Sequence, residues 1–204
     1  MASRKDSIRP LIDAREHTLY CGASMTGKTT LARLHAQQLS AAGYDLVIYD
    51  PVGTETASGY WPDGSEVIED RERFLRYLRD VRSDDPERPI FVFVDEAADI
   101  FDHSQRDARS IPRRCRHDGV YLRLIVQRPM MMHPDARTQC SIGFMFRLAR
   151  NDANLICADF GHGAEVSGEQ LDKGEFILLE SGSAKVSRHS LSQYVPGFSK
   201  PSQE

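Results

Sequence analysis

Residues 22–29 read Gly-Ala-Ser-Met-Thr-Gly-Lys-Thr, a full match to the pattern G-x-x-x-x-G-K-[ST]. The apolar run His17–Cys21 before this stretch predicts a strand, and Thr30–Gln38 after it predicts a helix with one apolar side. A strand, a loop and a helix in this order form the setting in which such a loop wraps around phosphate groups. The sequence therefore predicts a nucleoside triphosphate site.

The residue types in this loop suit the binding of an anion. Glycines let the main chain bend tightly, so that successive N–H groups point at one phosphate, and the N-terminus of the following helix adds a favourable dipole. Lys28 would place a positive charge between the β- and γ-phosphates of ATP, and the hydroxyl of Thr29 would bind Mg²⁺. The residues expected around the nucleotide are Gly22, Ala23, Ser24, Met25, Thr26, Gly27, Lys28, Thr29 and Thr30.

Size and composition are those of one globular domain. The chain has 204 residues, of which 40% are hydrophobic and 27% charged. A net charge of −4 argues against a protein that coats DNA tightly, although it allows a local basic surface. The four cysteines lack C-x-x-C spacing, so we expect neither a zinc site nor disulfides. This cysteine usage fits a reducing compartment. No apolar run approaches about 18 residues, so we expect no transmembrane segment.

The rest of the chain alternates expected strands and helices. Strands are expected over 45–50, 90–94, 120–126 and 142–148, helices over 69–82 and 104–117, a mostly loop segment over 52–68, and a closing hairpin over 174–179 and 184–190. Such alternation predicts an α/β fold with a mostly parallel sheet covered on both faces. We expect an N-terminal arm over 1–16, the domain over 17–190 and a C-terminal tail over 191–204.

Two acidic residues follow the apolar strand Ile90–Val94. Asp95, at the carboxyl end of this strand, would hold Mg²⁺, and Glu96 would orient and deprotonate an attacking water. The alternative is an ordinary strand that ends in a solvated turn. The position of the acidic pair, downstream of Lys28 with a helix and a strand between, favours the site.

Gln127 stands at the carboxyl end of the expected strand 120–126. A neutral amide at this point can donate to the γ-phosphate and accept from the attacking water, and can thereby sense which nucleotide is bound. The alternative interpretation is a polar residue that merely caps the strand.

Together these motifs resemble the FtsK/HerA superfamily of DNA-pumping ATPases. The resemblance also rests on the Asp-Pro that ends Val47–Pro51, on the segment from Arg116 to the Gln-Arg-Pro at 127–129, and on Leu171–Leu179 with its Gly-Glu-Phe. It covers about residues 17–190. It implies a three-layer P-loop NTPase fold of the additional-strand, catalytic-glutamate type, with a C-terminal β-hairpin. In this fold the strand leading to Gln127 lies between the phosphate-loop strand and the strand of Asp95.

A bare core of this length is most similar, within the superfamily, to the genome-packaging ATPases of membrane-containing icosahedral viruses with double-jelly-roll capsids. This resemblance implies ATP-driven movement of double-stranded DNA into a preformed capsid by a homo-oligomeric ring, expected to be a hexamer. The DNA would be bound non-specifically, and the capsid vertex or membrane-vesicle packaging proteins would be partners. The expected location is the host cytoplasm or the packaging vertex of the virion.

Three alternatives to viral packaging remain open from the sequence. One is another DNA-translocating or conjugation-type ATPase. Another is a small-molecule or nucleotide kinase, which also uses a phosphate loop on a compact domain. The third is a nucleotide-gated scaffold with little turnover. Glu96 beside Asp95, and Gln127 at the end of a central strand, favour water as the phosphate acceptor over a kinase substrate.

A ring also implies an arginine that acts on the nucleotide of a neighbouring subunit, an interaction worth about 10³–10⁵ in rate. Arg116 matches the arginine that the superfamily carries ahead of the sensor strand, and it is the chosen candidate. Arg147 and Arg150, at and just after the end of the next strand, are the alternatives. The ordinary role of each is a surface salt bridge.

Two further segments have two interpretations each. Five arginines could touch DNA phosphates without reading bases, or could form a solvated face balanced by acidic neighbours. A run of three methionines at 130–132 could fill the core or form a flexible interface patch. The arginines are Arg106, Arg109, Arg113, Arg114 and Arg116, and the acidic neighbours are Asp102 and Asp107.

Overall fold

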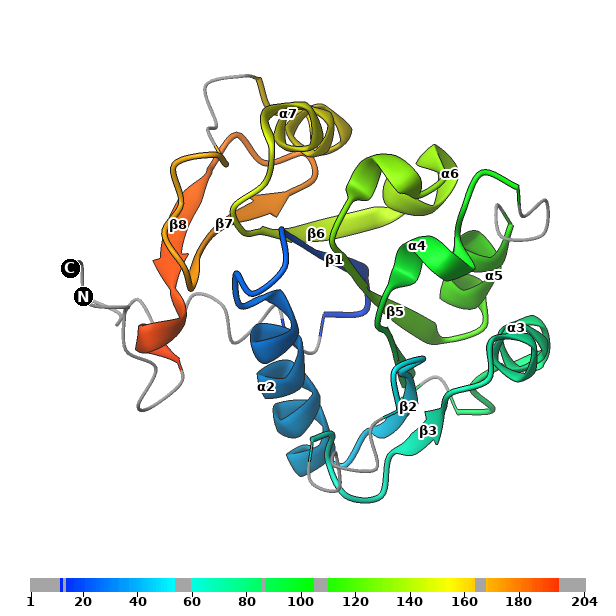
Figure 1. Ribbon diagram of the computed structural model, residues 1–204. Coiled ribbons are helices and arrows are strands. Elements are labelled where there is room, and N and C mark those ends of the chain that lie inside the picture. The colour runs from blue at the N-terminus through cyan, green and yellow to red at the C-terminus, as the bar shows by residue number, and fades with distance from the viewer. Residues whose placement is uncertain are drawn as a thin grey trace.

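One eight-stranded sheet organises the parts of the chain that the computed structural model describes, which are residue 12 and residues 14–53, 60–85, 87–104, 110–163 and 168–194 (Figure 1). The strand order is β3-β2-β4-β5-β1-β6-β7-β8. β1 to β6 pair in parallel, whereas β7 and β8 are antiparallel and close the sheet as a hairpin. The strands are β1 (His17–Cys21), β2 (Asp45–Tyr49), β3 (Glu66–Ile68), β4 (Ile90–Val94), β5 (Val120–Val126), β6 (Cys140–Met145), β7 (Glu175–Glu180) and β8 (Ser187–Ser190).

Helices cover both faces of the sheet. Figure 1 shows α2 on one side and α3, α5 and α7 on the other. Alternate side chains of one strand point to opposite faces of the sheet. In β1, Leu19 and Cys21 belong to the core on the side of α3, α5 and α7, whereas Tyr20 belongs to the core on the side of α2. The helices are α2 (Lys28–Ala41), α3 (Arg71–Asp80), α4 (Ala97–Ile100), α5 (Ile111–His117), α6 (Pro134–Arg137) and α7 (Arg150–Asp159), with the 3₁₀ turns η3 (Pro129–Met131) and η4 (Leu191–Gln193).

The predicted α/β class, the mostly parallel sheet and the closing hairpin are confirmed. β5 lies between β1 and β4, as expected for the strand that leads to Gln127. Because both β4 and β5 run parallel to β1, the carboxyl ends of all three strands reach the same edge of the sheet. This edge therefore carries the phosphate loop, Asp95 and Gln127 together.

Several boundaries differ from the sequence prediction. The segment expected as loop over 52–68 contains the edge strand β3, which pairs in parallel with Val47–Tyr49 and is too short to show a periodic pattern. The strand expected over 142–148 is β6, which begins at Cys140 and ends at Met145. The helix after the phosphate loop is longer than 30–38 at both ends. Within the described residues no helix combines the length and apolar character needed to cross a membrane.

The helix expected over 104–117 is also different. In the described residues it is α5, which begins only at Ile111, with Pro112 in its first turn, where a missing N–H costs nothing. Residues 105–109 lie outside the described parts, and with them Arg106, Asp107 and Arg109. The short helix α4, which directly follows the acidic pair, was not foreseen.

The packed unit reaches beyond residues 17–190 at both ends. The guanidinium of Arg123 is buried in β5 and donates to the carbonyls of Ile12 and Ala14 (3.0 Å each). It also lies 4.8 Å from the ring centroid of Phe91. At the other end Leu191 is buried, and its N–H donates to the carbonyl of Gly174 (2.7 Å). The last residues of the expected arm and the first of the expected tail are therefore part of the domain.

Candidate active site

The phosphate loop leaves β1 and enters α2 through two left-handed backbone positions. Met25 has φ 62° and Gly27 has φ 112°. At Gly27 a side chain is excluded, because a Cβ would lie 2.5 Å from Cδ1 of Leu191. The loop is braced from inside by the hydroxyl of Thr26, which donates to the carbonyl of Ala23 (2.8 Å). The turn is thus fixed by its own residues and by the C-terminal segment.

The interior of this loop offers donors and a positive charge without partners. The backbone N–H groups of residues 24–30 donate to no other described part of the chain. The ammonium of Lys28 is buried, and it forms neither a hydrogen bond nor an ion pair with the described residues. Burial lowers the pKa of Lys28, while Glu96 and Asp95 oppose this effect. N–H donors that have no partner among the described residues, gathered around a buried cation, fit the phosphates of a nucleotide.

Asp95 ends β4 on the edge of the sheet that carries the phosphate loop. Its N–H donates to the carbonyl of Tyr49 (2.9 Å), and its Oδ1 accepts from the N–H of Glu96 (3.0 Å). Burial, and then the negative charge of Glu96, raise the pKa of Asp95 to about 6. A carboxylate that is costly to ionise suits a site completed by a cation, and the carboxylate of Asp95 and the hydroxyl of Thr29 are oxygen ligands of the kind that Mg²⁺ takes.

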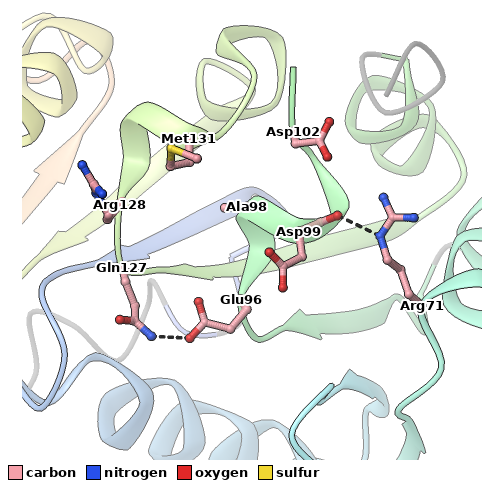
Figure 2. A pocket seen from close by; sticks show the side chains of 8 residues that line it. All are labelled: Arg71, Glu96, Ala98, Asp99, Asp102, Gln127, Arg128 and Met131. Carbon is pink, nitrogen blue, oxygen red and sulfur yellow. Dashed lines mark hydrogen bonds between the residues drawn. The ribbon is translucent and has the colours of Figure 1, made fainter. Parts of the chain in front are cut away.

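Glu96 and Gln127 lie in direct contact. Figure 2 shows the two side chains pointing toward one another, with the Nε2 of Gln127 donating to the Oε1 of Glu96. Glu96 has φ 51° and ψ 51°, a left-handed conformation that is rare for a residue with a side chain. Strained backbone of this kind is concentrated at functional sites, where the rest of the structure holds it in place. The amide and the carboxylate are thus coupled, although 31 positions separate them in the chain.

A cavity of about 590 Å³ opens beside this pair. Arg71 and Arg128 stand on opposite sides of the view in Figure 2, with Asp99 between them. Arg71 is held there because its Nε donates to the carbonyl of Asp99 (3.0 Å). The carboxylate of Glu96 therefore lies beside an open space on the side away from α2.

The three arginines considered for action in trans occupy different places. Arg116 lies at the opposite edge of the sheet from the phosphate loop, where it contacts residues just before β1 and β6: Glu16 at 3.3 Å and the carbonyl of Gln139 at 2.6 Å. Arg147 is exposed next to the loop, and its carbonyl accepts from the N–H of Ala23 (2.9 Å). Arg150 begins α7 and forms an ion pair with Glu169 (3.2 Å).

The described part of the arginine cluster is largely engaged within the chain. Arg114 lies 3.7 Å from Asp118 and donates to the carbonyl of Leu78, and Arg116 contacts Glu16 as above. Arg113 is exposed. The described residues therefore offer fewer available cations for DNA than the sequence suggested.

The methionine run divides between the two interpretations. Met132 is fully buried, whereas Met130 and Met131 are 50% and 54% exposed. Only Met132 fills the core, because Met130 and Met131 lie in the 3₁₀ turn η3 with their side chains exposed to solvent.

The structure adds a residue that the sequence did not single out. Arg33 of α2 lies over the rings of Tyr60 and Trp61, and its Nε is buried without a partner among the described residues. Burial lowers the pKa of Arg33 to about 10, an effect opposed by Asp95 and Asp50. The Nε1 of Trp61 in turn donates to Asp50 (3.0 Å). The Asp-Pro at 50–51 was the only sequence signal that pointed to this neighbourhood.

The sheet order, the phosphate loop and the acidic pair define the fold of a P-loop NTPase. No protein-family model matches the sequence, and no curated protein matches it. Solved structures do: the chain is similar to the genome-packaging NTPase B204 of Sulfolobus turreted icosahedral virus 2 in complex with AMPPCP, with 20% identity, a TM-score of 0.71, and coverage of 86% of this chain and 97% of that one.

Two other neighbours come from DNA transfer and secretion. The pCW3 conjugation coupling protein TcpA, with ATPγS, has 18% identity and a TM-score of 0.68 over 87% of this chain and 61% of that one. The cytoplasmic domain of the type VII secretion ATPase EccC of Thermomonospora curvata has 16% identity and a TM-score of 0.58 over 86% of this chain and 23% of that one. At these identities the likeness is one of fold, and it confirms the fold that the FtsK/HerA resemblance implies.

Proposed function

We propose that this protein hydrolyses ATP to move double-stranded DNA, and that its role is to package a viral genome into a preformed capsid. The observation that carries the proposal is the contact between Glu96 and Gln127 on the same edge of the sheet as the phosphate loop. The functions of B204 and TcpA, genome packaging and conjugative coupling, support DNA as the substrate that is moved.

We infer a role in hydrolysis for each of these groups. The N–H groups of residues 24–30 and the ammonium of Lys28 hold the β- and γ-phosphates. Thr29 and Asp95 would hold Mg²⁺, which neutralises charge on those phosphates. Glu96 orients a water and takes its proton as the water oxygen bonds to the γ-phosphorus and the bond to ADP breaks. Gln127 reports the presence of the γ-phosphate to Glu96 through their hydrogen bond.

The same proposal places the chain in a homo-oligomeric ring, a hexamer, that surrounds the DNA and binds it without sequence specificity. Arg116 acts on the nucleotide of the neighbouring subunit, and its position opposite the phosphate loop of its own chain suits action across a head-to-tail interface. The capsid vertex or membrane-vesicle packaging proteins are the partners, in the host cytoplasm or at the packaging vertex.

Phosphate release measured with and without duplex DNA tests this function. We expect the duplex to increase hydrolysis, and Glu96→Gln to abolish hydrolysis while ATP still binds, because the amide keeps the shape and loses the base. A kinase would instead transfer phosphate to a small acceptor and would be indifferent to DNA. That result would replace the proposal with the alternative function.

Mixed rings test the role of Arg116. Arg116→Ala should lose turnover and recover part of it when mixed with Lys28→Ala subunits, which cannot hydrolyse ATP but still carry the arginine. Arg147→Ala and Arg150→Ala are the matched controls. If mixing restores turnover to Arg147→Ala or Arg150→Ala but not to Arg116→Ala, the restored position, and not Arg116, is the arginine that acts in trans.

A further inference from the structure

The turn that follows Gln127 is held by two buried charged side chains from elsewhere in the chain. Asp152 of α7 is 6% exposed, and its Oδ1 accepts from the N–H of Met130 (3.0 Å). Arg137 of α6 is 4% exposed and donates to the carbonyls of Pro129 and Met132 at the two ends of η3. Both groups bind the main chain of the segment that continues directly from Gln127.

Apolar packing alone does not fix this turn. Met130 and Met131 face outward, so only Pro129 and Met132 anchor η3 in the core. Burying charged groups is costly, and such groups persist where their hydrogen bonds are needed. Arg137 has a carboxylate partner, Asp159, at 2.8 Å. Arg137 therefore restrains the two ends of the turn. In its middle, Asp152 binds the N–H of Met130, and the exposed His103 lies with its Nε2 3.3 Å from the carbonyl oxygen of Met130.

Asp152 also lies close to the base of the phosphate loop. The pKa of Cys21, the last residue of β1, is raised by burial, by Cys157 and by Asp152. The carboxylate thus holds the turn that follows Gln127 and lies within electrostatic reach of the end of β1. Asp152 also lies in the first turn of α7, where a negative charge interacts favourably with the helix dipole. That interaction would not require the side chain to be buried or to bind η3.

We propose that Asp152 is a positioning residue that fixes η3 and thereby sets where the amide of Gln127 stands relative to the γ-phosphate. Arg137 supports the same turn from its ends. This inference rests on the proposed function, since it assumes that Gln127 contacts the γ-phosphate. Its chemical consequence is that Asp152 tunes the distinction between nucleoside triphosphate and diphosphate without touching either.

The test compares the affinities of the full-length protein for ADP and for AMPPCP by calorimetry in the presence of Mg²⁺. A hydrogen bond to a charged group is worth enough to change affinity about tenfold or more. Asp152→Ala should weaken AMPPCP binding about tenfold and leave ADP binding unchanged. Asp152→Asn, which keeps an acceptor for Met130, should bind both like the wild type. In a Gln127→Ala background, Asp152→Ala should have no further effect.

Several outcomes would overturn the inference. Equal weakening of ADP and AMPPCP would show a general structural role, and so would full additivity with Gln127→Ala. If Asp152→Asn weakens AMPPCP binding as much as Asp152→Ala does, the effect comes from the charge of Asp152 and not from its hydrogen bond to Met130. Ile156→Val, a mild core change in the same helix, is the control and should keep the preference. If Asp152→Ala does not fold, Asp152→Leu takes its place. Wild-type protein that binds neither nucleotide contradicts the proposed function itself, not this inference alone.

Discussion

Replacing Asp95 by Asn is expected to stabilise the nucleotide-free protein at pH 7.5 while it destroys the proposed Mg²⁺ site. The carboxylate is half-buried beside Glu96, and loss of solvation together with the charge of Glu96 raises its pKa from 3.8 to about 6. The folded state therefore holds the proton more tightly than the unfolded state, and ionising Asp95 costs stability as the pH rises through this range. Asn keeps the oxygen that accepts from the N–H of Glu96 and removes the charge.

The size of the gain follows from the shift in pKa. A change of roughly 2 pKa units corresponds to at most about 3 kcal/mol of unfolding free energy at pH 7.5. Relaxation and solvent screening reduce this to about 1–2 kcal/mol. In a chain of this size that gain raises Tm by about 2–8 °C. At pH 4.5 the folded carboxyl is already protonated, so only about a third of the gain should remain.

Urea unfolding at both pH values, without nucleotide or Mg²⁺, measures the effect. Asp99→Asn, an exposed carboxylate on the next helix, is the matched control and should change stability by less than about 0.5 kcal/mol. An Asn variant no more stable than the wild type at pH 7.5 would refute the argument from burial. A gain that is equally large at pH 4.5 would show that charge is not its cause.

Three other predictions follow from the same geometry. The difference in Mg²⁺ affinity between wild type and Asp95→Asn, measured with nucleotide present, should narrow by about tenfold between pH 7.5 and pH 5, because the proton competes with Mg²⁺ for Asp95 below about pH 6. A difference that is as large at pH 5 as at pH 7.5 would contradict the raised pKa. Gly27→Ala should lower stability by more than about 1–2 kcal/mol, since strain at φ 112° adds to the clash with Leu191. Gly64→Ala is the control for backbone strain alone, because Gly64 has φ 85° and open space around it. If Gly27→Ala and Gly64→Ala lose the same stability, the clash with Leu191 makes no contribution. Arg123→Met should lower the free energy of unfolding, measured in urea, by about 3 kcal/mol, because it leaves the carbonyls of Ile12 and Ala14 without their donor. A loss below about 1 kcal/mol would show that Arg123 does not anchor Ile12 and Ala14.

Local sequence patterns were enough for most of the fold. Strands such as Ile90–Val94 are continuous apolar runs because both faces of a parallel sheet are covered. In the phosphate loop, Gly27 takes a left-handed backbone conformation that favours glycine. The helices and strands that were missed, β3, α4 and α6, have three or four residues each, too few to show a period. Within the described residues α5 begins at Ile111, and Pro112 lies in its first turn, whereas the sequence prediction placed this proline inside the helix.

The site divides in the same way. The sequence by itself predicted site roles for Lys28, Asp95, Glu96 and Gln127, because each follows the end of an expected strand. Only the tertiary structure placed Gln127 against Glu96 and brought Asp152 under the turn that follows it. It also set Arg116 at the far edge of the sheet. The physical reason is that strand periodicity and turn sterics act between neighbours in the chain, whereas a buried polar contact depends on which distant segments the packed core brings within hydrogen-bond reach.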